Sequence, residues 1–303
     1  MFYVTGDKHG NYNDVLDFCC QNDTTQNDVL VILGDAGINF CQDARDRKLK
    51  ELLATLPITL FCIHGNHDMR PQNIASYKEV SWNAGVVFME EEYPNILFAK
   101  DGEVYNFDGK SVLVIGGAYS VDKKYRLFKN LPWFEDEQPS AEVKDKVLEK
   151  LRQVDWSVDI ILTHTMPYDC ESQLFLSANI DQTTVDKSTE HWLDYIMSNT
   201  KFSLWYGGHF HFDAEIRENM FVMFNGYREL ISTKAIDVVG VPLYRVGDSV
   251  SFMYKNKKVQ GLIYNVRPYG FGDYAKPMYS ILVGDVYCKR IPQDQILSLL
   301  YKC

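Results

Sequence analysis

The 303-residue sequence lacks the features that mark several classes of protein. Its seven cysteines form no Cys-x-x-Cys motif, so a thiolate zinc site or a paired redox motif is not indicated. There is no run of about 18 apolar residues, the length that a helix needs to cross a bilayer. Met1 leads within a few residues into an expected strand, which leaves no room for a secretion signal. We therefore expect a reduced, cytoplasmic protein with no membrane partner.

The chain also has fewer positively charged than negatively charged residues. The net charge of −10 disfavours a grip on nucleic acid by the protein as a whole. Residues 234–303, however, hold ten Lys or Arg against five Asp or Glu, whereas residues 1–233 hold 21 against 36. Two regions of opposite net charge, +5 and −15, predict two domains with a boundary between residues 233 and 234.

The first third of the chain alternates apolar runs with amphipathic segments. Runs at 1–5, 29–33 and 58–63 predict buried strands. The segments between them, one from about Asn13 and one from Asp43 to Leu56, predict helices. A βαβαβ order implies a parallel sheet with right-handed crossovers.

The middle of the chain has a different pattern. Short apolar runs broken by turns between Gly85 and Ser120 predict consecutive, mostly antiparallel strands in a second sheet packed on the first. We expect residues 121–140 to form a loop over the site. Helices are then expected over 141–154 and 187–198, and further strands at 159–163, 202–206, 214–218 and 220–225. The predicted fold class is therefore α/β (α+β), a two-sheet β-sandwich flanked by helices.

The C-terminal region, from Leu243 onward, has strand-like runs without helical periodicity. These runs predict a small all-β barrel of the SH3-like kind that ends in a short helix from Asp294 to Leu300. Its net positive charge and many tyrosines make it a candidate platform for single-stranded nucleic acid. Docking on the acidic domain and binding of another protein are the alternatives.

Polar side chains follow five of the predicted strands at the point where each strand ends. They include six of the seven histidines: Asp7, His9, Asp35, His64, Asn66, His67, Asp68, His164, His209 and His211. Because parallel-sheet proteins place their chemistry at the carboxyl ends of the strands, these residues are expected to gather. Imidazole and carboxylate ligands without thiolate suit Mn, Fe or Zn, and a pair of such ions suits phosphate-ester hydrolysis.

The order of these segments carries a family resemblance. Together they resemble the five motifs of the calcineurin-like metallophosphoesterase superfamily: Gly6-Asp7-x-His9, Gly34-Asp35, Gly65-Asn66-His67-Asp68, Thr163-His164 and Gly208-His209-x-His211. The resemblance covers about residues 1–233. It implies a four-layer fold and hydrolysis of phosphate esters by two divalent transition-metal ions, with Mn expected and Fe or Zn as alternatives.

The resemblance also implies a role for each motif residue. The implied metal ligands are Asp7, His9 and His211 for one ion, Asn66, His164 and His209 for the other, and Asp35 as the bridge between them. His67 would protonate the leaving-group oxygen, and Asp68 would orient its imidazole. His64 lies outside the pattern, and we expect it to be structural.

The chain departs from the pattern of one branch. Members that resemble the eukaryotic phosphoprotein phosphatases continue the second motif with an Asp and a phosphate-gripping Arg, where this chain has Ile38 and Asn39. Another residue must then grip the phosphate. The candidates are Asn11, Arg70 and Arg126, and the alternative for each is an ordinary solvated side chain.

Three functions are compatible with these residues. The leading prediction is a phosphomonoesterase that acts on a phosphoprotein or a small phosphorylated substrate. The alternatives are a phosphodiesterase or nuclease, and a non-catalytic, metal-stabilised binding scaffold. His67 separates enzyme from scaffold, because a scaffold has no need of a proton donor beside a complete set of metal ligands.

Overall fold

The computed structural model describes residues 1–171, 181–236, 238, 244–267, 277–284 and 286–301. Contacts divide the chain into two compact units. The first unit consists of residues 1–12 and 23–236, and the second of residues 13–22 and 237–303. No helix in the described ranges has both the length and the apolar character needed to span a bilayer.

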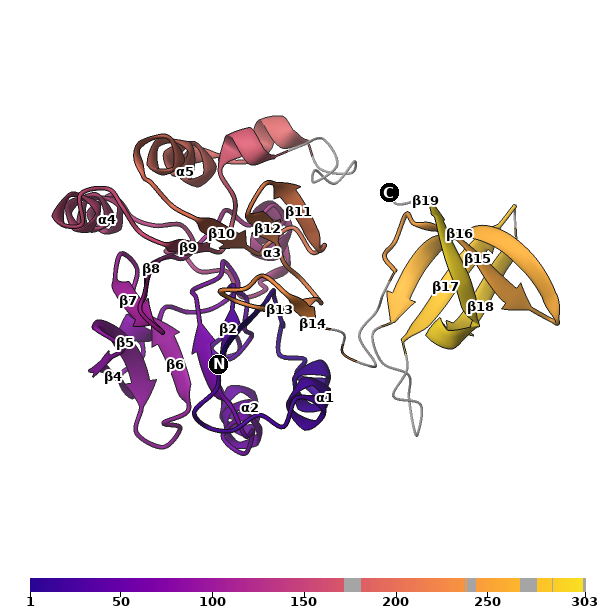
Figure 1. Ribbon diagram of the computed structural model, residues 1–303, viewed down its shortest axis with the longest axis horizontal. Coiled ribbons are helices and arrows are strands. Elements are labelled where there is room, and N and C mark those ends of the chain that lie inside the picture. The colour runs from indigo at the N-terminus through magenta and orange to yellow at the C-terminus, as the bar shows by residue number, and fades with distance from the viewer. Residues whose placement is uncertain (172–180, 237, 239–243, 268–276, 285, 302–303) are drawn as a thin grey trace. The chain divides into compact units, whose positions relative to one another are not determined.

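The larger sheet of the first unit has eight strands in the order β14-β13-β1-β2-β3-β6-β5-β4 (Figure 1). Their bounds are β1 Phe2–Thr5, β2 Val29–Ile32, β3 Thr59–Cys62, β4 Tyr77–Trp82, β5 Gly85–Glu90, β6 Ile96–Ala99, β13 Tyr227–Glu229 and β14 Ala235–Ile236. Strands β1, β2, β3 and β6 are parallel. Helix α2, Ala44–Leu53, joins β2 to β3, so the predicted parallel arrangement at the start of the chain is confirmed.

The second sheet has six strands in the order β11-β12-β10-β9-β8-β7. Their bounds are β7 Val104–Phe107, β8 Lys110–Ile115, β9 Ile160–Thr163, β10 Leu204–Gly207, β11 Ala214–Arg217 and β12 Met220–Val222. Helices α4, Ala141–Gln153, and α5, Ser188–Asn199, cover its outer face (Figure 1). Helix α3 is Lys123–Lys129, and short 3₁₀ turns occur at Pro71–Asn73, Tyr168–Cys170, Gln182–Thr184 and Gln293–Gln295.

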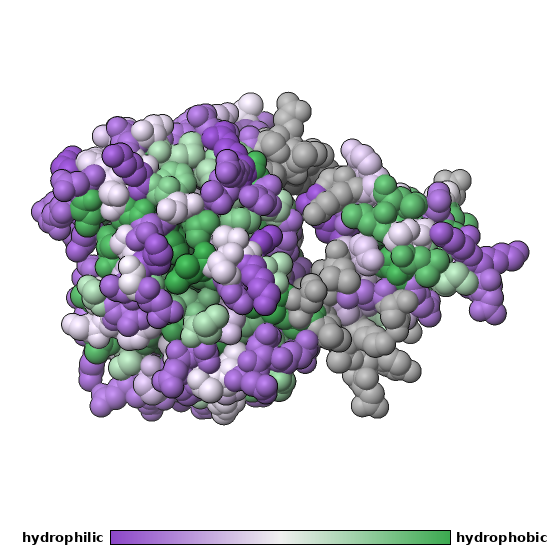
Figure 2. All heavy atoms as spheres, in the orientation of Figure 1, coloured by the Kyte–Doolittle hydropathy of each residue, from purple (hydrophilic) through white to green (hydrophobic). Residues whose placement is uncertain are grey.

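The main core lies between the two sheets. Alternate residues of each strand point inward, for example Val31 and Phe61 from the first sheet and Val114 and Leu162 from the second, all of which are fully buried. In the view of Figure 2, hydrophobic residues gather where the two sheets of Figure 1 face each other, and hydrophilic residues surround them. This buried layer makes the fold a two-sheet sandwich with helices outside, as predicted.

Two expectations for the middle of the chain are wrong. The strands between Gly85 and Ser120 do not form one second sheet, because β5 and β6 join the first sheet and β7 and β8 the second. The expected loop over 121–140 contains α3. Its large apolar side chains Leu127 and Phe128 are exposed, 79% in the case of Phe128. The segment therefore has no buried apolar stripe by which the sequence could reveal a helix.

The second unit contains α1, Asn13–Gln21, and a five-stranded antiparallel sheet in the order β18-β17-β16-β15-β19. The strands are β15 Ser249–Tyr254, β16 Lys257–Arg267, β17 Met278–Val283, β18 Val286–Pro292 and β19 Ile296–Tyr301. The all-β prediction is confirmed. Between the described residues of the edge strands β18 and β19 no pairing occurs, so the SH3-like barrel stays a prediction.

The predicted helix from Asp294 to Leu300 is wrong. Residues 296–301 form β19, which pairs antiparallel with β15. The Ser298 hydroxyl lies 2.7 Å from that of Ser251 on the neighbouring strand, and Ile296 is buried in the core of the unit. The leucines between and beyond them suit a helix by propensity, but pairing with β15 decides the conformation.

Phe61 tests the inter-sheet core. Its ring contacts those of Trp82, Tyr105 and Phe107, with centroids 5.2, 5.0 and 5.4 Å away. Phe61→Ala should lower the free energy of unfolding by about 3–5 kcal/mol because it leaves a cavity between the sheets. Chemical unfolding followed by tryptophan fluorescence measures this. The exposed Phe128→Ala should change stability by no more than about 0.5 kcal/mol. A loss below about 1 kcal/mol in the Phe61 variant would contradict the packing described.

Candidate active site

The five motifs meet at the carboxyl ends of parallel strands from both sheets. Asp7 and His9 follow β1, Asp35 follows β2, and Asn66 and His67 follow β3. The second sheet contributes His164 after β9 and His209 and His211 after β10. Four of these residues have the positive φ that side chains rarely adopt: 46° for His9, 45° for Asp35, 69° for His209 and 56° for His211. Such backbone strain is concentrated at functional sites.

One compact group of three possible metal ligands consists of Asp7, His9 and His211. Oδ2 of Asp7 lies 3.2 Å from Nε2 of His211 and 3.9 Å from Nε2 of His9, and the two imidazole nitrogens are 2.9 Å apart. The backbone amide of His209 donates to Oδ1 of Asp7. The buried Oδ2 atom has no hydrogen bond among the described residues. Three possible metal-ligand atoms lie close together, and one of them is a buried carboxylate oxygen without a hydrogen bond. Such a group fits a bound cation.

His164 belongs to a second set with Asp7 and Asp35. Its Nδ1 lies 2.7 Å from the carbonyl oxygen of Leu33, which can only accept, so Nδ1 carries the proton. Its Nε2 faces Oδ1 of Asn66 at 2.8 Å. The Asn66 amide is held in this orientation because its Nδ2 donates to Ser120 Oγ at 3.0 Å. Nε2 of His164 and Oδ1 of Asn66 are thus next to each other, and both kinds of atom can bind a divalent metal ion.

The pKa values of the buried side chains in the site also fit a bound cation. Burial and the Asp7 carboxylate together raise the pKa of Asp35 to about 8. Burial alone would also raise the pKa of Asp7, but its close contact with His211 and the other nearby imidazoles hold that pKa well below the usual range. Burial and the positive neighbours lower the pKa of His9 to about 4, in spite of Asp7. Burial alone would lower the pKa of His211 as well, but its contact with Asp7 raises it. Two buried carboxylates among imidazoles suit divalent transition metals.

Glycines in the motifs make room for these ligands. A Cβ atom on Gly34, whose φ is +100°, would lie 2.0 Å from Nδ1 of His164. On Gly65 it would lie 2.0 Å from Oδ1 of Asp35 and 2.1 Å from its backbone nitrogen. The glycine beside a ligand residue in one motif therefore lets a ligand from a different motif approach.

His67 lies next to the ligands and faces the cavity. Its backbone amide donates to Oδ1 of Asp35 at 2.8 Å. Its Nε2 lies 3.1 Å from Nδ2 of Asn66 and 3.5 Å from Nη2 of Arg126. Burial, with the positive charge of Arg126, lowers the pKa of His67 to about 3. Arg126 is itself held by Asp122, whose two carboxylate oxygens both accept from Nε at 2.8 Å.

Three expected roles are not supported by the geometry. Asp68 accepts from the backbone amide of Gly37, and no hydrogen bond joins it to His67 within the described chain, so it anchors the loop after β2. Arg70 is buried in an ion pair with Asp101 and donates to the carbonyl of Asp136, so it is structural. Asn11 is exposed and is not among the described residues that line the cavity.

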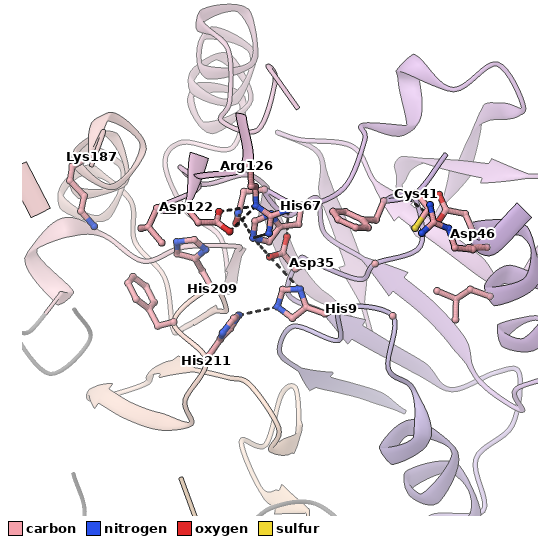
Figure 3. Close-up of a pocket in the computed structure, with 18 of the residues that line it drawn as sticks. His9, Asp35, Cys41, Asp46, His67, Asp122, Arg126, Lys187, His209 and His211 are labelled. Atoms are coloured by element: carbon pink, nitrogen blue, oxygen red, sulfur yellow. Dashed lines mark hydrogen bonds and ion pairs between the residues drawn. The ribbon is translucent and has the colours of Figure 1, made fainter. Parts of the chain in front are cut away.

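The ligands open into a cavity of about 760 Å³. Figure 3 shows His9, Asp35, His67, His209 and His211 together, with Arg126 above them. The sequence singled out Arg126, and the structure brings it to His67. Other lining residues were missed: Phe40, Cys41, Arg45, Asp46, Leu49, Val121, Asp122, Gln182, Lys187 and Phe210. Phe210 is the variable position of the fifth motif, and the others lie on helices and loops outside the motifs, where no pattern marks them. His64 is buried away from the cavity lining, as expected.

This arrangement could hold metal ions, and the comparison with known proteins names the family. The sequence model of the calcineurin-like phosphoesterase family matches residues 1–213. The chain belongs to this family, whose chemistry is metal-dependent hydrolysis of phosphoesters. No curated protein matches the chain.

Solved structures match the chain at a low level, two of them as follows. One is TT1561 of Thermus thermophilus, with 15% identity, 78% of this chain and 96% of that chain covered, and a TM-score of 0.46. The other is AQ665 from Aquifex aeolicus, described as a protein of unknown function, with 12% identity, 67% and 87% covered, and a TM-score of 0.31. The family assignment rests on the motifs and the matched residues.

Gly65→Ala should weaken metal binding and also lower stability, because the new methyl group meets both the carboxylate and the backbone nitrogen of Asp35. We expect an affinity for Mn²⁺ that is about 10–100-fold lower, measured by titration calorimetry. Gly109→Ala is the matched control. Gly109 also has a positive φ, +82°, but its Cβ would meet no described atom within 4 Å. The control should lose about 1 kcal/mol of stability and no Mn²⁺ affinity. Unchanged affinity in the Gly65 variant would refute the assignment of Asp35 as a ligand.

Proposed function

We propose that the chain is a two-metal phosphomonoesterase that acts on a phosphorylated protein or small molecule. The observation that carries the proposal is the position of Arg126. Its guanidinium is fixed by Asp122 and lies 3.5 Å from Nε2 of His67, on the cavity side of the metal ligands. A terminal phosphate offers three oxygens, so a planar donor fork beside the proton donor suits a monoester.

The proposed ions are held by the seven residues named from the sequence. Asp7, His9 and His211 would hold one, Asn66, His164 and His209 the other, and Asp35 would bridge. When bound, the ions would supply Lewis acidity and a water nucleophile that is active at neutral pH. The donor set of nitrogen and oxygen atoms without sulfur supports Mn, with Fe or Zn as the alternatives.

The remaining steps belong to the protein's own side chains. Arg126 would bind the phosphoryl oxygens and orient them toward the metal ligands. His67 would give a proton to the leaving alcohol from Nε2. The low pKa of His67 holds for the protein without substrate. A dianionic phosphate beside the imidazole favours its charged form, which is the form that can donate.

The substrate class is tested by comparing p-nitrophenyl phosphate with bis(p-nitrophenyl) phosphate, each with added Mn²⁺. We expect kcat/KM for the monoester to exceed that for the diester by at least about 10-fold, since a diester lacks the third terminal oxygen for Arg126. His67→Ala should lower kcat on an alkyl phosphate by about 10²–10⁴-fold and retain its Mn²⁺. A faster diester would establish the phosphodiesterase alternative. No turnover of either substrate by Mn²⁺-loaded protein would favour the scaffold.

The two arginines should behave differently when they are removed. Arg126→Ala should lower kcat/KM by about 10–150-fold, because a charged hydrogen bond contributes about 1.5–3 kcal/mol, and should cost less stability than Arg70→Ala, because its partner Asp122 is 41% exposed. Arg70→Ala leaves Asp101 buried without its partner, so it should cost about 3–5 kcal/mol of stability. Thermal unfolding and steady-state kinetics on each variant separate the two effects. If Arg126→Ala has normal kinetics, the phosphate grip lies elsewhere.

A further inference from the structure

The cavity is much larger than a phosphoryl group requires. Its volume of about 760 Å³ lies in the range of sites that enclose whole small molecules. Figure 3 shows that the residues lining the cavity extend from the histidines in two directions, to Lys187 on one side and to Cys41 and Asp46 on the other. The chemistry of these two ends determines what the alcohol part of a substrate can be.

The end near Cys41 has an apolar wall formed by Phe40 and Leu49, which we call the Phe40 wall. Both side chains are partly buried and line the cavity. Leu49 lies against the first motif, since a Cβ on Gly10 would be 3.7 Å from its Cδ2 atom. The Phe40 ring lies under the Arg126 guanidinium, whose carbon is 5.9 Å from the ring centroid. A chain of neighbours thus leads from His67 through Arg126 to this wall.

The Phe40 wall is held in place by its own loop. The carboxylate of Asp46, at the start of α2, accepts from the backbone amides of Cys41 and Gln42 at 3.0 and 2.7 Å. Asp46 is buried and is therefore occupied in fixing the loop that carries Phe40. A wall fixed in this way is preorganised, so a ligand that binds there does not need to order it first.

The other end of the cavity is less suited to an apolar group. Lys187 forms an ion pair with Glu171 at 2.9 Å, which makes this end polar and balanced in charge. Phe210, which also lines the cavity, packs against the core of the second sheet and against the ring of His209. These contacts already cover part of the surface of the Phe210 ring. The Phe40 wall is therefore the better surface for an apolar leaving group next to His67.

We infer that the Phe40 wall selects phosphate monoesters of aromatic alcohols, in which a flat ring is attached directly to the ester oxygen. This inference rests on the proposed function, because it names the substrate class of the same site. The Arg126 guanidinium would bind the phosphoryl group while it stays in contact with the Phe40 ring. The ring of the substrate would lie along Phe40 and Leu49. A tyrosine phosphate and a simple aryl phosphate share this chemistry.

Binding of phosphonates tests the inference without any difference in leaving group. Phenylphosphonate and methylphosphonate carry the same anion and differ in the ring. With Mn²⁺ present, titration calorimetry should give a Kd for phenylphosphonate at least about 10-fold lower, as burial of a ring predicts. Phe40→Leu keeps the apolar character but removes the aromatic face, so it should reduce this preference by about 2–12-fold. Leu52→Ala, an exposed position on α2, should leave it unchanged.

The outcomes separate this inference from the proposed function. Equal affinity for both phosphonates, or a preference that Phe40→Leu does not reduce, overturns the Phe40 wall and leaves the phosphomonoesterase in place. Tighter binding of adenosine 5′-phosphate than of phenylphosphonate overturns the direct attachment of the ring. If neither phosphonate binds, turnover of p-nitrophenyl phosphate decides the proposed function, and 4-methylumbelliferone, an aromatic alcohol without phosphate, decides the inference. Phe40-dependent binding of that alcohol would uphold the wall, and no such binding would overturn it.

Discussion

The structure of the site depends on two buried carboxylates, Asp7 and Asp35, brought together from neighbouring parallel strands. A buried pair of like charges is costly unless positive charge lies between or beside them. The imidazoles around them supply only part of it: burial lowers the pKa of His9 and of His209, and although burial alone would also lower that of His211, its contact with Asp7 raises it. We infer that bound cations balance this charge. The positive φ of four of the site residues shows that the surrounding fold holds the ligands in place at a cost.

The rest of the first unit serves to bring these side chains to one edge. The parallel strands of each sheet end at the site, and the core between the sheets fixes their separation. Backbone amides from one motif bind the carboxylates of another: the amide of His67 binds Asp35, and the amide of His209 binds Asp7. A ligand is thus positioned by residues distant in sequence, and Gly34 and Gly65 allow the close approach that this requires.

The gathering of these polar side chains was predictable from the sequence because each follows an apolar strand, and the ends of parallel strands share an edge. The ligand role of each residue was implied by the family resemblance. What the sequence could not reveal depends on packing between distant segments. Arg70 and Arg126 are alike as residues, but Asp101 buries one and Asp122 holds the other over the cavity. Helix α3 was missed because its apolar side chains are exposed, and β19 because pairing with β15 overrides a leucine-rich pattern. The Phe40 wall has no motif at all.

The central claim is that Asp35 bridges two metal ions. The most direct test is the metal content and Mn²⁺ affinity of the protein after dialysis against Mn²⁺, compared between the native chain and Asp35→Asn. We predict two ions per chain in the native protein, because seven ligand-type residues converge where a single closed site needs about four. The variant should hold no more than one ion tightly. A native stoichiometry of one or less, with binding unchanged in Asp35→Asn, would contradict the account.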